Sequence, residues 1–304
     1  MKLGFVSAIL DGWTFEEMMD TAAGLGYECV EAACWPQGKA ERRYAGVSHI
    51  DVDNDSRGYV AHIHETCKKT GVEISALAYY PNTMDGDFQK REDAIRHLKK
   101  VIAFSEKLGI GMVTTFVGRD QTKSVEENLE AFGRIWPPII QYAEEHGVRI
   151  AIENCPMLFG REQWPGGHNL FTSPALWRKM FDIMPSKNFG INYDPSHFVW
   201  QMMDYIQPIY EFRERIFHVH YKDIKVYPQK LKDVGIMAYP LEYMEPKLPG
   251  LGDVDWGRYV SALTDIGYDG FTCVEVEDRA FESDRERILD SLKLSKRYIE
   301  QFVI

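Results

Sequence analysis

Cysteine is scarce in this 304-residue sequence, and no two cysteines stand in a Cys-x-x-Cys spacing. The five are scattered along the chain as Cys29, Cys34, Cys67, Cys155 and Cys273. A disulfide scaffold needs an even set and a thiolate zinc site needs closely paired cysteines, so the sequence argues against both. We expect these residues to be small buried hydrophobes in a reducing compartment.

Long hydrophobic runs are also missing. No apolar stretch comes near the roughly 20 residues that a membrane-spanning helix needs. The N-terminus carries one positive charge at Lys2, and its mostly apolar stretch turns polar at Asp11 without a small-residue cleavage site. This pattern predicts a first buried strand rather than a signal peptide, and with it a cytoplasmic protein that does not contact membranes.

Positive charge is the third deficit. Lysine and arginine total 35 against 46 for aspartate and glutamate, which gives a formal net charge of −11. An acidic surface opposes nucleic acid and anionic membranes, because both attract clustered lysine and arginine. The negative net charge does not oppose binding of a small neutral ligand. Hydrophobic residues make up 45% of the chain and charged residues 27%, as in a soluble protein with a full core.

Short β-branched or aromatic runs alternate with amphipathic helical stretches along the whole chain. The predicted strands are Leu3–Ala8, Cys29–Ala33, Glu73–Ala78, Met112–Val117, Arg149–Glu153, Phe189–Asp194, Ile216–His220 and Phe271–Glu275. The predicted helices are Thr14–Leu25, Gly58–Thr70, Arg91–Leu108, Glu126–Glu145, Pro174–Ile183, a stretch near Asp204–Glu214, Trp256–Ile266 and Asp284–Phe302. Pro137 and Pro138 should kink or split the fourth helix.

This alternation indicates an α/β fold with parallel strands joined by right-handed crossovers. Eight such units in about 250–300 residues match a (β/α)8 TIM barrel, and we expect one such domain over residues 1–304. An open doubly wound sheet is the alternative. That fold binds dinucleotides through a Gly-x-Gly-x-x-Gly sequence after its first strand, and this chain has none there.

The two kinds of connection differ in length. Helix-to-strand connections are short and often contain glycine, whereas three strand-to-helix connections are long: Cys34–Arg57, Asn154–Ser173 and Tyr221–Asp255. Long connections are usually functional, and in a barrel these meet at the C-terminal rim, where barrel enzymes place their sites. The third is rich in tyrosine and methionine, so we expect it to cover the mouth or to pack against a second subunit of a homo-oligomer.

Acidic and imidazole side chains stand at the ends of four consecutive predicted strands, as Glu153, Asp194, His220 and Glu275. This oxygen-rich set with one nitrogen suits Mn²⁺, Mg²⁺ or Co²⁺ better than an ion that prefers thiolates. Three carboxylates so close together would repel one another without a cation, so the sequence predicts a divalent metal site.

Two neighbours share a strand face with these residues, His218 with His220 and Glu277 with Glu275. We expect His218 to lie deeper, behind the ligands. Glu277 competes with Glu275 as the fourth ligand.

The series Ile-Glu-Asn, Asp-Pro-Ser-His, His-Val-His and Val-Glu-Val-Glu resembles the xylose isomerase-like superfamily of metal-dependent TIM barrels. That superfamily includes D-tagatose 3-epimerase, inosose isomerases and dehydratases, 3-keto-glycoside epimerases and endonuclease IV. The resemblance spans essentially the whole chain. It implies one divalent ion on Glu153, Asp194, His220 and Glu275, with Mn²⁺ first and Mg²⁺, Co²⁺ or Zn²⁺ as alternatives. It also implies that Glu153 and Glu275 move protons and that His197 contacts the substrate.

The chemistry of sugar epimerases and isomerases fits these residues. Such enzymes remove a proton from a carbon beside a carbonyl, and a Lewis-acidic metal stabilises the enediolate. A positioned carboxylate takes the proton, which is worth about 10²–10⁴-fold in rate. Two glutamates on opposite sides of the metal favour an epimerase. We therefore expect a small carbohydrate substrate, a keto-sugar or a 3-keto-glycoside.

The chain departs from the ketohexose epimerases at two positions, with Phe159 in place of a sugar-binding glutamate and Val226 in place of an arginine. The identity of the sugar therefore does not carry over from the resemblance. The residues that could substitute are Lys222, Asp223 and Arg279. Trp35 and Tyr79 directly follow strands two and three, and we expect their aromatic faces to pack on the sugar.

Other activities compete with this prediction. A lyase or dehydratase on the same substrates begins with the same proton abstraction and stays open, whereas a sugar-binding barrel without catalysis would need no base. An endonuclease IV-type phosphodiesterase would need further histidines on the early strands and an Asp-x-His after strand seven. This chain has Cys34-Trp35-Pro36, Tyr79-Tyr80-Pro81 and Lys225-Val226-Tyr227 at those places.

Overall fold

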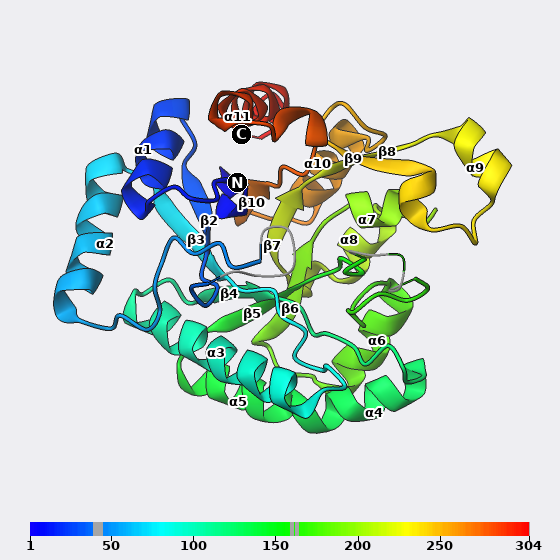
Figure 1. Ribbon diagram of the computed structural model, residues 1–304, viewed down its shortest axis with the longest axis horizontal. Helices are drawn as coiled ribbons and strands as arrows, with labels where there is room; N and C mark the ends of the chain where they lie inside the picture. Colours follow the sequence, from blue (N-terminus) through cyan, green and yellow to red (C-terminus); the bar gives the residue numbers. More distant parts are fainter. Residues whose placement is uncertain (39–44, 159–160, 162–163, 304) are drawn as a thin grey trace.

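The computed structural model describes residues 1–38, 45–158, 161 and 164–303. Its central feature is a closed barrel of eight parallel strands in the order β1-β10-β7-β6-β5-β4-β3-β2, which confirms the predicted TIM barrel (Figure 1). The strands are β1 (Lys2–Val6), β2 (Cys29–Ala33), β3 (Glu73–Ala78), β4 (Met112–Thr115), β5 (Arg149–Glu153), β6 (Phe189–Tyr193), β7 (Ile216–Tyr221) and β10 (Phe271–Val274).

Several strands end earlier than the sequence pattern predicted. β1 stops at Val6 because Ser7–Ile9 turns into a short 3-10 helix, η1. β6 stops at Tyr193 and β10 at Val274, so Asp194 and Glu275 are the first residues beyond their strands. This places both carboxylates at the rim of the barrel rather than inside the hydrogen-bonded sheet.

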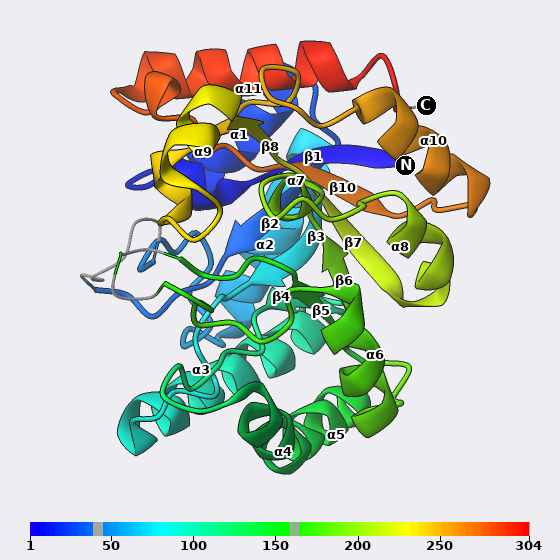
Figure 2. The same ribbon diagram turned by 90° about the vertical axis from the view of Figure 1, so that its right-hand side faces the viewer.

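Helices surround the barrel, as the two views in Figures 1 and 2 show. They are α1 (Phe15–Leu25), α2 (Arg57–Thr70), α3 (Phe88–Lys107), α4 (Val125–Ile135), α5 (Pro137–Glu145), α6 (Pro174–Ile183), α8 (Gln207–Glu211) with η3 (Arg213–Arg215), α10 (Trp256–Asp265) and α11 (Arg285–Ile299). α11 lies beside α1 in both views and closes the ring. The hydroxyl of Tyr27 donates to the carbonyl of Leu292 at 2.8 Å across this contact.

The helix boundaries follow from capping and from proline. Thr14 with Glu17, and Ser124 with Glu127, form complete capping boxes at the starts of α1 and α4. The predicted split at the two prolines is confirmed, because α4 ends at Ile135 and α5 begins at Pro137. Proline is tolerated at a first helical position because that position needs no amide hydrogen bond.

The longest rim connection, between β7 and α10, forms a small structure of its own. β8 (Asp223–Val226) and β9 (Met244–Lys247) pair antiparallel, with α9 (Pro228–Val234) and the 3-10 helix η4 (Pro240–Glu242) between them. α9 stands away from the barrel in Figure 1, drawn in yellow. A further short helix, α7 (Ser196–Val199), follows β6.

Asp223 ties the two ends of this connection together. Its carboxylate accepts hydrogen bonds from the amides of Gly250 and Val254 and from the indole of Trp256, at 2.9, 3.1 and 2.9 Å. A Cβ at Gly252 would lie 2.2 Å from Asp223 Oδ1, so only glycine permits this approach. Asp223 therefore has a structural role, because its hydrogen bonds hold the two ends of this connection together.

Two features of the structure concern the membrane and redox environment of the chain: the length of its helices and the state of its cysteines. Among the described residues, no helix is both long and apolar enough to cross a membrane. All five cysteines are free thiols, with Cys29, Cys34 and Cys273 buried and Cys67 and Cys155 partly exposed.

Candidate functional site

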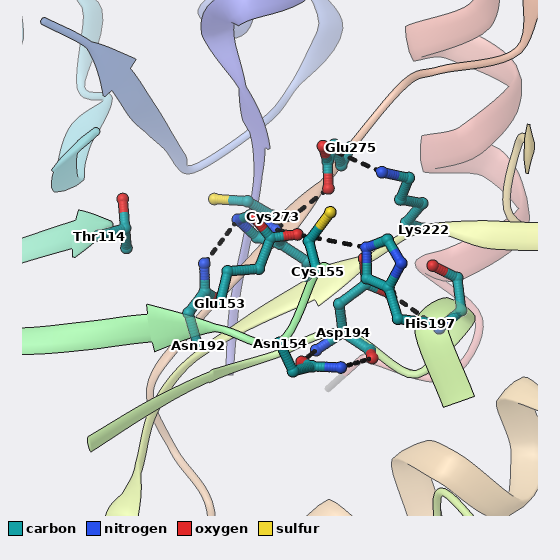
Figure 3. A network of polar contacts seen from close by, with 12 residues as sticks. Thr114, Glu153, Asn154, Cys155, Asn192, Asp194, His197, Lys222, Cys273 and Glu275 are labelled. Carbon is teal, nitrogen blue, oxygen red and sulfur yellow. Dashed lines mark hydrogen bonds and ion pairs between the residues drawn. The ribbon is translucent and has the colours of Figure 1, made fainter. Parts of the chain in front are cut away.

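Four side chains converge at the C-terminal rim, which we call the ligand cluster: Glu153, Asp194, His220 and Glu275. They offer one ligand atom each, and these atoms all lie within 4.8 Å of one another. Nδ1 of His220 is 3.6 Å from Oε1 of Glu153 and 3.2 Å from Oε2 of Glu275. Figure 3 shows the carboxylates of Glu153, Asp194 and Glu275 approaching one another from separate strand ends. The structure thus brings all four predicted ligands together.

The facing atoms of the ligand cluster make no hydrogen bond to any residue that the structure describes. Glu153 Oε1, Asp194 Oδ2, His220 Nδ1 and Glu275 Oε2 are buried, and none has a hydrogen-bond partner within the described parts of the chain. Burying polar atoms in this way is costly unless something else satisfies them. Three carboxylate oxygens and one imidazole nitrogen make a donor set that fits one divalent ion.

Two of the three carboxylates, those of Asp194 and Glu275, are oriented by a contact to their second oxygen. The amide of Ser196 donates to Asp194 Oδ1 at 2.8 Å, which leaves Oδ2 pointing at the cluster. Asn154 donates to the carbonyl of Asp194 and accepts from its amide, both at 2.8 Å, and so joins the ends of β5 and β6. Lys222 Nζ lies 3.3 Å from Glu275 Oε1, which leaves Oε2 free to face His220.

The two glutamates of the cluster have opposite pKa shifts. Burial opposes the charge on Glu153, but the imidazoles of His197 and His220 beside it outweigh that effect and hold its pKa below the usual range. Burial raises the pKa of Glu275, and the charges of Glu153 and Glu277 raise it further against the opposing pull of Lys222. The two carboxyl groups therefore lie in different electrostatic surroundings, imidazoles beside Glu153 and further carboxylates beside Glu275.

His197 lies against the same cluster. Its Nε2 is 3.2 Å from Asp194 Oδ2 and 3.6 Å from Glu153 Oε1, and the side chain is buried. Burial disfavours the imidazolium form, but the neighbouring Cys155 and Asp194 raise the pKa of His197 well above its usual range. Figure 3 shows the ring at the edge of the three carboxylates, where it could contact a ligand held there.

A pocket lined by both polar and apolar residues opens at the cluster. Its polar lining residues include Glu153, Lys222 and Glu275, and its apolar ones include Trp35 and Phe116. Lys222 is buried and pairs with Glu275 and with Glu277, whose Oε2 is 2.6 Å from Nζ. Glu277 therefore faces the lysine, while Glu275 faces the ligand cluster.

The remaining predicted substrate contacts lie elsewhere. Tyr79 is buried behind the pocket, with its ring edge-on to Trp35 at 4.9 Å, and the described wall of the pocket contains Tyr80 in its place. Arg279 is exposed in the short helix η5 (Arg279–Phe281), away from the described pocket wall. Phe159 lies outside the described residues.

The tyrosine- and methionine-rich connection packs beside the mouth. The indole of Trp164 donates to the carbonyl of Met237 at 3.0 Å, and Arg161 pairs with Glu242 at 2.6 Å. These contacts join it to the connection between β5 and α6. The pocket wall, as far as the structure describes it, contains no residue of α9 or η4. Packing against a second subunit stays a prediction.

One layer deeper lies a set of polar side chains that we call the buried network: Glu31, Ser75, Asn192 and His218. His218 Nδ1 is 3.0 Å from Asn192 Oδ1, and its Nε2 is 3.1 Å from Ser75 Oγ. His218 thus lies behind the ligands, as predicted. Glu31, His218 and His220 could also group around an ion, but the facing atoms of these three already contact protein partners.

Sequence analysis missed Glu31, although a signal was available. Glu31 is the single charged residue of the otherwise apolar strand β2, and its side chain has no exposed surface. Alternation along a barrel strand turns it to the interior together with Cys29 and Ala33. A lone carboxylate at an inward position of a barrel strand is the feature that points to it.

The chain is similar to known proteins in sequence and in fold. The profile of the family described as xylose isomerase-like TIM barrel matches residues 19–298. An inosose dehydratase from Lactiplantibacillus plantarum is 27% identical over 246 residues, which cover 78% of this chain and 78% of that protein.

Two solved structures show the likeness of fold. D-psicose 3-epimerase from Clostridium cellulolyticum, crystallised with D-tagatose, has a TM-score of 0.70 at 15% identity and covers 100% of this chain and 99% of its own. The IolI protein with a bound zinc atom has a TM-score of 0.73 at 17% identity, with 99% of both chains covered. Because the family profile matches nearly the whole length of the chain, the chain belongs to the xylose isomerase-like TIM-barrel family.

Proposed function

We propose that this protein is a divalent-metal-dependent epimerase or isomerase of a keto-sugar or 3-keto-glycoside. The observation that carries the proposal is the pair Glu153 and Glu275, whose carboxyl groups approach one centre from the ends of β5 and β10. β6 and β7 separate the two strands in the barrel, so the carboxyl groups reach the centre from different sides. Two such groups can remove a proton from one face of a carbon and return one to the other.

The ligand cluster would hold the ion through Glu153, Asp194, His220 and Glu275, with Mn²⁺ as the first candidate. When bound there, a divalent ion supplies Lewis acidity toward a carbonyl oxygen of the substrate and so favours loss of the neighbouring proton. The likeness to a zinc-binding barrel supports a divalent ion without naming it.

In the proposed reaction, the ionised carboxylate of Glu153 takes the proton from the carbon beside the carbonyl. The C–H electron pair moves into the carbon–carbon bond, and the carbonyl becomes an enediolate oxygen. Glu275, on the other side of the centre, returns a proton to the opposite face. Lys222 holds the second oxygen of Glu275 and keeps this carboxyl aimed at the centre.

The pocket wall suits a sugar. Trp35 is one of the residues that line it, and the ring of Tyr79 packs edge-on against Trp35. Aromatic faces pack on the apolar C–H faces of sugar rings. His197 lies within reach of a hydroxyl group held at the cluster, and Lys222 adds a charged donor to the pocket lining.

Turnover of keto-sugars and 3-keto-glycosides in D₂O with Mn²⁺ tests the proposal. A two-carboxylate epimerase should place deuterium at the inverted carbon, because each carboxyl exchanges its proton with solvent. Partial direct transfer of the substrate hydrogen would indicate a one-base isomerase. A product without solvent deuterium would contradict the two-carboxylate mechanism.

Dehydration is the second candidate, favoured by the sequence similarity to an inosose dehydratase. It begins with the same proton abstraction by a carboxylate and ends with loss of the β-hydroxyl as water instead of reprotonation. The same D₂O experiment separates the two, because a dehydratase would yield an unsaturated or tautomerised product that is lighter by one water.

A further inference from the structure

Glu31 is a buried carboxylate that the proposed chemistry does not use. It lies in the middle of β2 with no exposed surface. A buried charge is costly unless it is paired and hydrogen bonded, so the partners of Glu31 should reveal what it does.

Both carboxylate oxygens of Glu31 have defined partners. Oε1 accepts hydrogen bonds from the hydroxyl of Tyr80 at 2.5 Å and of Thr114 at 2.9 Å. Oε2 lies 2.6 Å from Nε2 of His220. Two donors, Thr114 in β4 and Tyr80 beyond the end of β3, thus fix the carboxylate. Its remaining oxygen lies nearest to Nε2 of His220, with Nδ1 of His218 farther away at 3.5 Å.

This contact decides which nitrogen of His220 faces the cluster. With Nε2 turned to Glu31, Nδ1 is the nitrogen near Glu153 and Glu275. An imidazole binds a metal through its unprotonated nitrogen, and the hydrogen bond of the other nitrogen sets which one that is. A proton held on Nε2 by Glu31 leaves the lone pair of Nδ1 for the ion.

A second side chain competes for the same nitrogen. Asn192 Nδ2 is 3.0 Å from His220 Nε2, and as a donor it would favour the opposite tautomer, with the proton on Nδ1. The contact with Glu31 is shorter and involves a charged acceptor, and such bonds are roughly twice as strong as neutral ones. Asn192 has an alternative acceptor in the hydroxyl of Tyr80 at 3.2 Å.

We propose that Glu31 is a positioning residue that fixes the orientation and tautomer of His220 for metal binding, a role that rests on the metal site proposed above. The same carboxylate also holds Tyr80, whose ring lines the pocket. The carboxylate of Glu31 therefore contacts both a proposed metal ligand, His220, and a residue of the pocket wall, Tyr80.

Zinc affinity of the Glu31→Gln variant tests this role. Glutamine keeps the size of the side chain but removes its charge, and loss of such a partner typically costs about 10–100-fold in metal affinity. Competition with a chelator should show a loss in that range for the folded protein, while Glu65→Gln, on the exposed side of α2, should match wild type. A merely structural role would lower the stability of the metal-free protein without moving zinc affinity.

The wild-type protein offers a second measurement that does not depend on a variant folding. In the zinc-loaded chain labelled with ¹⁵N-histidine, His220 should carry its proton on Nε2, protected from solvent exchange, with none on Nδ1. A proton on Nδ1, or an unprotected Nε2–H, would overturn the role of Glu31.

Asp194→Asn separates this proposal from the metal site itself. If Asp194→Asn loses zinc while Glu31→Gln binds it within twofold of wild type, Glu31 has no positioning role and the metal site stands. If Asp194→Asn also keeps wild-type zinc affinity, the metal site fails and the role of Glu31 fails with it.

Discussion

The ligand cluster and the buried network lie in successive layers of one barrel, yet their hydrogen bonding is opposite. Both contain carboxylate or amide oxygens around a histidine. In the cluster, the facing atoms of Glu153, Asp194, His220 and Glu275 have no hydrogen-bond partner among the described residues. In the network, both nitrogens of His218 contact protein partners. The donor types alone would mark either layer as a metal site, whereas the pattern of unsatisfied atoms selects the cluster.

The largest expected effect comes from removing a cluster ligand. Asp194→Ala should lose both stoichiometric metal and turnover, because Asp194 supplies a buried oxygen that no described neighbour replaces. Elemental analysis of chelator-free protein measures the metal, and Asp20→Ala on the exposed face of α1 is the control. If Asp194→Ala still held stoichiometric metal, the unsatisfied atoms of the ligand cluster would not mark it as the metal site, and the contrast with the buried network would fail.

Changing the proton-transfer groups should be the next largest effect. Glu153→Gln and Glu275→Gln keep the size and one ligand oxygen but remove the base, so each should lose about 10²–10⁴-fold in kcat. Metal content is measured beside the rate, since both residues are also proposed ligands. Wild-type turnover with metal retained in both variants would exclude these residues from the chemistry.

A change in the buried network should act mainly on stability. His218→Phe removes the partner of Asn192 Oδ1 and of Ser75 Oγ, and a buried polar group left unpaired costs about 1–3 kcal/mol. Urea unfolding of the metal-free protein should show a decrease in that range. Unchanged stability combined with lost zinc affinity would mean that His218 belongs with the ligands.

The smallest effect concerns acid sensitivity away from both layers. Burial lowers the pKa of His49 below its usual 6.5, and the ring bridges Ser7 Oγ and the carbonyl of Leu10 at 3.0 and 3.1 Å. The unfolded chain therefore binds a proton first as the pH falls through 6.5, and stability contributed by neutral His49 is lost below that value.

Thermal unfolding of wild type between about pH 7.5 and 5.5 should show this loss, and His49→Gln should make the dependence shallower. His97 is also buried with a lowered pKa, so part of the slope should remain in the variant. An identical slope in the two proteins would assign the acid sensitivity to other groups.

The barrel could be predicted from sequence because each strand and helix repeats one local pattern. The cluster residues were accessible because Glu153, Asp194, His220 and Glu275 stand at strand ends, where a barrel brings distant segments to one rim. Their spacing in sequence matters little once eight strands close. Capping explains further helix starts, such as that of α3 at Phe88 after the cap of Asp87.

Side-chain direction within the rim loops could not be predicted in the same way. Tyr79 and Tyr80 are adjacent, and a single step of backbone turns the first behind the wall and the second into it. Arg279 stands four residues beyond Glu275, yet its chain turns outward in η5. The sequence offers Glu31 only as a lone charge in an apolar strand. Its partners Tyr80, Thr114 and His220 are distant in sequence, so its contacts could not be predicted.

The hydrogen bonds of Asp223 have a consequence for how this barrel can change over evolutionary time. They join the two ends of the connection between β7 and α10, which contains α9. The residues between these ends are therefore anchored to the barrel at one place. Insertions, deletions or substitutions between the two joined ends need not move β7 before them or α10 after them. This connection can therefore behave as a replaceable module, in which a new sequence changes the surroundings of the pocket entrance while His220 keeps its position.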